Sequence, residues 1–154
     1  MSTDPSTPTP SPGTSTSGAK RLARVLILDS EAVSALAEKR KGMAERLAAA
    51  QQVDHRVLIP AVVLAEVATG APTDAAIWHV LGKIPTVDLP QSVAMRAGAL
   101  RARGEKVRRK KRDLTVDAIV AATAVELAPS VVITADKSDL ELLVDGFDVK
   151  VSAV

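Results

Sequence analysis

Residues 115–140 read TVDAIVAATAVELAPSVVITADKSDL, and this stretch decides the prediction of the fold. It starts with a helix-like segment, breaks at Pro129 and Ser130, continues as a β-branched run over 131–134, and ends in a helical segment over 138–144. Because β-branched residues favour strands, we predict a helix–strand–helix unit. The unit contains two acids in unusual places: Asp117 has apolar neighbours, and Asp136 follows the strand.

The chain before and after this stretch continues the alternation of strands and helices. Apolar runs predict strands over 24–28, 56–59, 84–87 and 147–151, and helical patterns cover 31–39, 43–52, 61–69, 72–82 and 91–103. Alternating strands and helices are joined by right-handed crossovers and form a parallel sheet between helical layers. The sequence therefore predicts an α/β fold of three layers, α/β/α, with a central parallel sheet.

Length and composition narrow the class of protein. With 154 residues, of which 47% are hydrophobic, the chain can bury a sizeable core. It has no cysteine, which excludes disulfides and thiolate metal sites and fits a reducing, cytoplasmic setting. No apolar run approaches the roughly 20 residues of a membrane span, and the N-terminus lacks the apolar core of a signal peptide. We therefore expect no membrane partner, and the net charge of +2 favours an anionic one.

A change in composition divides the chain in two. Residues 1–19 are almost entirely Ser, Thr, Pro and Gly. Such a segment cannot bury enough apolar surface to offset the entropy of ordering, so we predict a disordered tail. Residues 20–154 form the single folded domain.

Two further acids, Asp29 and Glu66, lie in the first half of the chain. Asp29 follows the first predicted strand, and ligands of open α/β sheets bind beyond the carboxyl ends of strands. Glu66 lies in a predicted helix on a face that holds Val62 and Val63, where an unpaired charge is costly. Each has an ordinary alternative: Asp29 as the cap of the next helix, for which Ser30 is also suited, and Glu66 as a charge at the rim of the core.

The acids of the opening stretch have similar alternatives. Asp117 lies near a helix start, where the helix dipole favours an acid, although Thr115 is available as a cap. Asp136 is the preferred site residue after the strand, with Asp139 as a rival or an additional ligand. Thr134 is placed to hydrogen-bond a carboxylate or a bound water.

Together the four acids predict a metal site. Like charges about 4 Å apart repel by roughly 4 kcal/mol at an effective dielectric of 20, so a cluster of carboxylates needs a cation. Ligation by oxygen alone selects Mg²⁺ or Mn²⁺ over zinc. Such an ion can activate water and orient a phosphodiester.

The four motifs resemble those of PIN-domain nucleases. Asp29 follows VLIL, Glu66 lies in IPAVVLAEVATG, Asp117 in TVDAIVAATA and Asp136 in VVITADKSDL. The likeness is to VapC-type toxins of bacterial toxin–antitoxin pairs, particularly actinobacterial ones. It implies a PIN-like fold and an endoribonuclease in which these acids, and Asp139 as a further candidate, hold Mg²⁺ or Mn²⁺. It also implies a homodimer and an antitoxin whose C-terminal segment covers the active-site groove.

A basic segment precedes Asp117. Residues 101–112 hold eight Lys or Arg residues and one acid. Lys and Arg contacts to phosphates give affinity that does not depend on sequence, so we predict that Arg108, Arg109 and Arg112 guide RNA. The alternatives are a solvated face, or a contact for an acidic antitoxin.

Two other functions compete with the nuclease. One is a catalytically silent PIN-like module that binds RNA or a protein partner. The other is a phospho-accepting receiver domain, but that fold requires an acidic pair at the end of the first strand, where this chain has Asp29 followed by Ser30.

Overall fold

The computed structural model describes residues 24–108 and 112–154. The predicted tail over 1–19, the first residues of the predicted domain and Arg109 lie outside these ranges. The described residues form five strands that belong to one sheet. These are β1 (Val25–Leu28), β2 (Arg56–Pro60), β3 (Thr86–Val87), β4 (Ser130–Thr134) and β5 (Val149–Ala153).

The sheet is parallel, with the strand order β3-β2-β1-β4-β5. β1 lies in the centre, where Leu28 pairs with Ile133 of β4 on one side and Ile27 pairs with Leu58 of β2 on the other. The chain runs outward from β1 to β3 and then returns to start again at β4. The strand order therefore reverses between β1 and β4, and in open α/β sheets this is where ligands bind.

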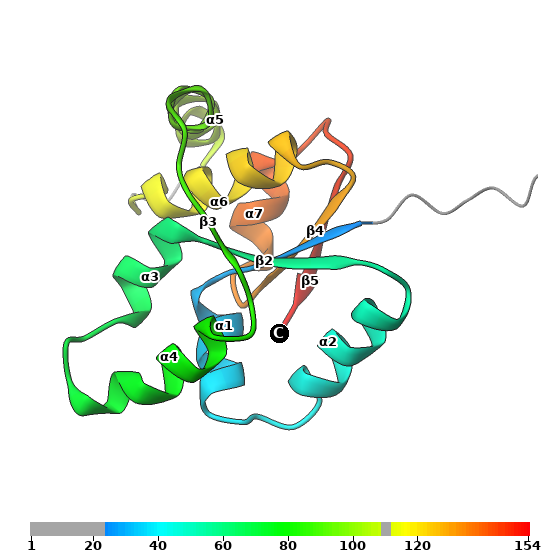
Figure 1. The fold of residues 1–154 in the computed structure, drawn as a ribbon. Helices are drawn as coiled ribbons and strands as arrows, with labels where there is room; N and C mark the ends of the chain where they lie inside the picture. The colour runs from blue at the N-terminus through cyan, green and yellow to red at the C-terminus, as the bar shows by residue number, and fades with distance from the viewer. Residues whose placement is uncertain (1–23, 109–111) are drawn as a thin grey trace, which may run out of the picture.

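Helices cover both faces of the sheet, as Figure 1 shows. The helices between β1 and β3 are α1 (Ser30–Ala37), α2 (Met43–Gln52), α3 (Ala61–Val67) and α4 (Ala75–Leu81), with a 3₁₀ turn at Pro72–Asp74. The second layer contains α5 (Gln91–Val107), α6 (Thr115–Glu126) and α7 (Lys137–Leu143). The predicted three-layer α/β/α fold with a central parallel sheet is therefore confirmed.

The core explains this arrangement. All four residues of β1 are buried, because helices pack on both of its faces, and the buried residues of the molecule form one apolar cluster. Helix α6 is buried on nearly all sides, since it lies between the sheet and α5. Among the described residues, no helix is both long and apolar enough to cross a membrane.

Several element boundaries differ from the predicted ones. Asp29, and not Ser30, caps α1, since its carboxylate accepts a hydrogen bond from the Ser30 amide. Asp and Ser are about equally good caps, so the sequence could not choose between them. β2 extends one residue beyond the predicted 56–59, to Pro60, and the helix predicted over 61–69 ends at Val67. Helix α5 continues to Val107, into the basic segment.

Candidate active site

Asp29 is held rigidly at the carboxyl end of β1. It is 6% exposed, and its Oδ1 accepts a hydrogen bond of 2.8 Å from the backbone amide of Ser30. Its Oδ2 accepts a 2.7 Å hydrogen bond from the hydroxyl of Thr134, the last residue of β4. The predicted hydrogen bond of Thr134 to a carboxylate is confirmed. The two strand ends at the reversal of the sheet are thus linked by side chains.

Glu66 reaches the same place from α3. Its Oε2 accepts a hydrogen bond from the Ser30 hydroxyl, which also lies 3.2 Å from Asp29 Oδ1. The expectation that Glu66 lies on a buried face is wrong, because Glu66 itself is exposed and Val63 is the only fully buried residue of α3. The sequence predicts Ser30 only as a cap of the following helix. Its hydroxyl comes directly after Asp29, an acid at the end of a strand, and this position was the signal that Ser30 could link Asp29 to Glu66.

Asp117 lies in the first turn of α6 and is partly buried. Burial raises the pKa of its carboxyl from 3.8 to about 6, and the negative charges of Asp29, Asp136 and Asp139 act in the same direction, while Arg112 opposes them. The charges of these acids therefore act on the Asp117 carboxyl across the space at the ends of β1 and β4. The structure thus brings Asp117 to the end of the sheet that holds Asp29 and Asp136.

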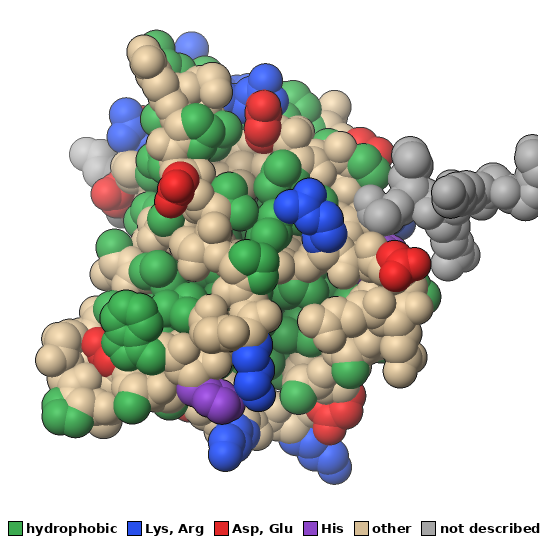
Figure 2. Space-filling view, in the orientation of Figure 1, with side chains coloured by type: hydrophobic (Ala, Val, Ile, Leu, Met, Phe, Trp, Pro, Cys, Tyr) green, Lys and Arg blue, Asp and Glu red, His purple; other side chains and the backbone are tan. Residues whose placement is uncertain are grey.

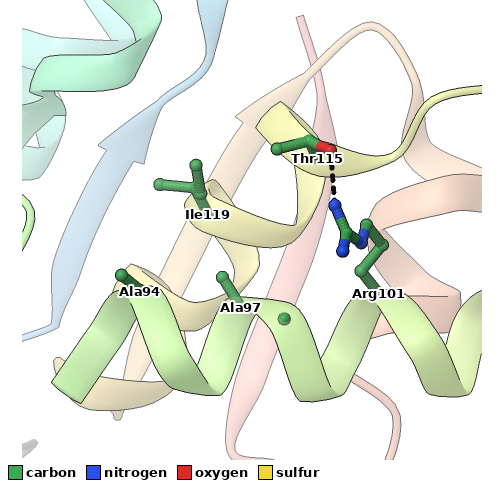
Figure 3. A pocket seen from close by; sticks show the side chains of 6 residues that line it. Ala94, Ala97, Arg101, Thr115 and Ile119 are labelled. Atoms are coloured by element: carbon green, nitrogen blue, oxygen red, sulfur yellow. Dashed lines mark hydrogen bonds between the residues drawn. The ribbon is translucent and has the colours of Figure 1, made fainter. Parts of the chain in front are cut away.

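The start of α6 is fixed by residues that the sequence did not single out. Asp113 accepts hydrogen bonds from the amide and the hydroxyl of Thr115, at 2.9 and 2.6 Å. Arg101 of α5 donates a 3.0 Å hydrogen bond to the same hydroxyl (Figure 3). Both side chains line a cavity of about 190 Å³. These contacts set the position of Asp117, two residues along the helix.

Asp136 lies between β4 and α7, at the N-cap position of α7. Its backbone amide donates a 3.0 Å hydrogen bond to the Thr134 hydroxyl, and its carboxylate pairs with Arg112. Partial burial acts to raise the pKa of Asp136, but hydrogen bonds from Asp139 and Arg112 lower it overall. Asp136 is therefore ionised more readily than an ordinary aspartate, whereas Asp117 is ionised less readily.

Asp139 and Arg108 form a second ion pair beside the first. Asp139 is 4% exposed, and burial together with the charge of Asp136 raises its pKa. Its Oδ2 lies 2.9 Å from Nη1 of Arg108 and 3.7 Å from Nη1 of Arg112. The Arg108 side chain is thus turned toward the protein, while Arg112 is exposed, and the role of both in guiding RNA stays a prediction.

On the face of the molecule in Figure 2, the basic side chains of the described residues do not form one continuous surface. Figure 2 shows Lys and Arg side chains scattered among acidic and apolar ones on the face in view. Arg112 is the predicted RNA contact that is both described and open to solvent.

The donors at this end of the sheet are all oxygens, as Mg²⁺ and Mn²⁺ prefer. Burial contributes most to the raised pKa of Asp117 and the negative charges of the other aspartates add to it, and a cation would offset both effects. Over the described ranges 24–108 and 112–154, however, no three Asp, Glu or His side chains are arranged as a ready-made metal site. Glu66 is held by Ser30 and Asp136 by Arg112, so both would have to turn toward an ion. The residue types fit a divalent cation, although the side-chain arrangement is not that of a loaded site.

Comparison with known proteins places this geometry in a family. A model of the PIN domain matches residues 26–141, most of the chain. The chain belongs to the PIN domain family. The resemblance derived from the four acidic motifs is confirmed, and all four predicted acids lie in the matched range of the PIN domain. A search of curated proteins found no match.

Solved structures show the same fold at low sequence identity. This PIN domain is similar to VapBC2 from Rickettsia felis bound to a promoter DNA fragment, with a TM-score of 0.67 and 14% identity over 84% of this chain and 98% of that one. It is also similar to DNA-bound VapBC from Salmonella typhimurium, with a TM-score of 0.66 and 18% identity over 84% and 98%. For FitAcB from Neisseria gonorrhoeae the TM-score is 0.55, with 18% identity over 82% and 95%. At these identities the likeness shows the fold.

Proposed function

We propose that this PIN domain is a metal-dependent endoribonuclease and the toxin of a type II toxin–antitoxin pair. The observation that carries the proposal is the meeting of Asp29, Asp117 and Asp136 at the reversal of the strand order. Asp29 is linked through Thr134 to the end of β4, and the charges of Asp29 and Asp136 help to raise the pKa of Asp117. A group of mutually repelling carboxylates in a PIN domain suits a divalent cation and a phosphodiester.

Four acids, Asp29, Glu66, Asp117 and Asp136, would hold Mg²⁺ or Mn²⁺. When bound, the ion would neutralise charge on the phosphodiester and lower the pKa of the attacking water. Asp29 is the fixed member, because hydrogen bonds from the Ser30 amide and the Thr134 hydroxyl orient its carboxylate. Glu66 is the adjustable member, since it is exposed and one serine hydroxyl holds it. Asp117 has to lose its proton before it binds a cation, so the proposed site is most open to metal above pH 6.

Arg112 is the proposed contact to the RNA backbone. More than half of its side chain is exposed, and it lies against Asp136. A guanidinium in that place can exchange a carboxylate for a phosphate, since both offer two oxygens to its planar fork. Arg109, the neighbouring predicted contact, lies outside the described residues.

The proposed partners are an antitoxin and a second copy of the chain, in the cytoplasm. Support for the antitoxin comes from the similar solved structures, which are VapBC and FitAB antitoxin complexes. Co-expression with the product of a small adjacent gene, followed by purification of one component, tests for a stable complex. Sedimentation of the purified chain tests for the homodimer.

RNA cleavage by the purified protein tests the central proposal. We expect cleavage with Mg²⁺ or Mn²⁺, none with EDTA, and none in Asp29→Asn or Asp117→Asn variants that keep the native circular dichroism spectrum. Asp148→Asn is the matched control, because Asp148 is exposed and precedes the edge strand β5. Activity that survives in the Asp29 and Asp117 variants would show that these acids do not carry the reaction.

One observation favours the catalytically silent module. Across the part of the chain that the structure describes, the acids do not form a ready-made metal site, and two of them are already engaged by Ser30 and Arg112. In a silent module these contacts would be permanent. Titration with Mn²⁺ separates the two functions, because the silent module would show no saturable binding and would bind RNA equally well with EDTA.

A further inference from the structure

Asp139 and Arg108 form a buried ion pair whose role the nuclease proposal leaves open. Arg108 caps the end of α5, and Asp139 lies in the first turn of α7. Their side chains are 18% and 5% exposed, and the closest nitrogen and oxygen lie 2.9 Å apart. These two atoms are shielded from water and have no aligned hydrogen bond within the described residues, so the attraction between the charges is what compensates their burial.

The approach of α5 to α7 creates this pair. Gly104, one turn before Arg108, has no side chain, and a Cβ atom added there would lie 3.1 Å from Cδ2 of Leu143 in α7. Arg103 also donates a 3.0 Å hydrogen bond to the backbone carbonyl of Leu143. Close packing of α5 against α7 therefore places the Arg108 side chain beside Asp139.

Asp136 is held in a different way. Its side chain is 29% exposed, and its partner Arg112 is 57% exposed. An exposed ion pair contributes little to stability, so Arg112 can leave Asp136 at small cost. A buried pair cannot separate in this way, because the remaining charge would be left without compensation.

We propose that Arg108 is a positioning residue that keeps Asp139 as its permanent counter-ion, so that of the two α7 acids only Asp136 serves as a metal ligand. Asp139 then anchors the start of α7 and thereby holds Asp136 at the end of β4. The inference rests on the proposed metal-dependent function and selects between two acids that the sequence left as rivals.

Single and double variants of the full chain test the pairing. We expect Arg108→Gln and Asp139→Asn each to lower the melting temperature by at least about 4 °C, because each leaves a buried charge without its closest partner. The double variant removes both charges and should lose less than the sum of the two single losses. The exposed pair Arg96 and Glu126, at 3.6 Å, is the matched control and should show additive, small effects. Additive losses for Arg108 and Asp139 would overturn the pairing.

Calorimetric titration with Mn²⁺ tests the assignment of the ligand. We expect the charge-balanced double variant to bind Mn²⁺ within about threefold of the wild type, and Asp136→Asn to bind at least about tenfold more weakly, as for a lost ligand. A double variant as weak as Asp136→Asn would make Asp139 a ligand and overturn the inference while leaving the nuclease proposal intact. A wild-type chain that binds no Mn²⁺ would instead overturn the proposed function and the ligand assignment with it, and the melting data would still decide whether Arg108 positions Asp139.

Discussion

The hydroxyl of Thr134 donates a 2.7 Å hydrogen bond to the buried carboxylate of Asp29 and accepts a 3.0 Å hydrogen bond from the amide of Asp136. One side chain thus joins the ends of β1 and β4 and the start of α7. Because Thr134 is fully buried, water cannot replace either contact when the hydroxyl is removed.

Thr134→Val removes the hydroxyl and keeps the shape of the side chain. We expect a loss of about 1–3 kcal/mol in the free energy of unfolding, since two buried polar groups lose a partner. Urea denaturation followed by circular dichroism measures it. Thr134→Ser is the control and should retain most of the stability. An unchanged free energy in the valine variant would mean that the two groups find other partners.

The strands were predictable because continuous apolar runs of four or five residues are typical of buried strands and are short for helices. The meeting of Asp29 with Asp136 was predictable for the same reason, since parallel strands bring their carboxyl ends to one edge of the sheet. The family motifs then suggested the roles.

Contacts between distant segments were not predictable. Glu66 is exposed because the packing of other elements against α3 does not extend to its side chain. The pattern of apolar residues in the sequence does not show how far that packing extends. The turn of Arg108 toward Asp139 depends on the approach of α5 to α7. A run of basic residues has the same appearance whether each points to solvent or to an internal acid, so Arg108 and Arg112 could not be told apart.

Glu66→Gln separates function from stability. Glu66 is exposed and its carboxylate has one described partner, Ser30, so we expect the free energy of unfolding to change by less than about 0.5 kcal/mol. If Glu66 holds the metal, RNA cleavage should fall at least about tenfold, which corresponds to about 1.4 kcal/mol of activation free energy. Glu45→Gln, on the exposed side of α2, is the control. Equal cleavage by both variants would remove Glu66 from the proposed site.

Asp74→Asn should weaken the protein at neutral pH more than at acid pH. The Asp74 carboxylate accepts hydrogen bonds from the backbone amides of Thr69 and Gly70 and from the Thr69 hydroxyl, which lower its pKa below 3.8. A lowered pKa in the folded state gives stability that is present above pH 3.8 and is lost as the pH falls. Melting temperatures at pH 7 and pH 2.5 check this, and the difference between wild type and variant should shrink at pH 2.5. A difference that grows toward acid pH would contradict the assignment.

Asp117→Asn should have the opposite pH dependence. The pKa of Asp117 rises from 3.8 to about 6 on folding, so the folded protein binds more protons than the unfolded chain between these values. Its contribution to stability is therefore complete below pH 3.8 and is lost as the pH rises through 6. The full shift corresponds to about 3 kcal/mol, and screening of this partly exposed group reduces it to about 1–2 kcal/mol.

In EDTA at pH 8 we expect Asp117→Asn to be more stable than the wild type by that amount, because asparagine removes the repelled charge. At pH 3.5 the two proteins should unfold at nearly the same urea concentration, because the carboxyl is then protonated in both the folded and the unfolded state. Adding Mn²⁺ at pH 8 should stabilise the wild type and close the gap, since a bound cation relieves the repulsion that the substitution relieves permanently. A variant that is less stable than the wild type at pH 8 in EDTA would mean that hydrogen bonds of the ionised Asp117 outweigh its repulsion by Asp29, Asp136 and Asp139.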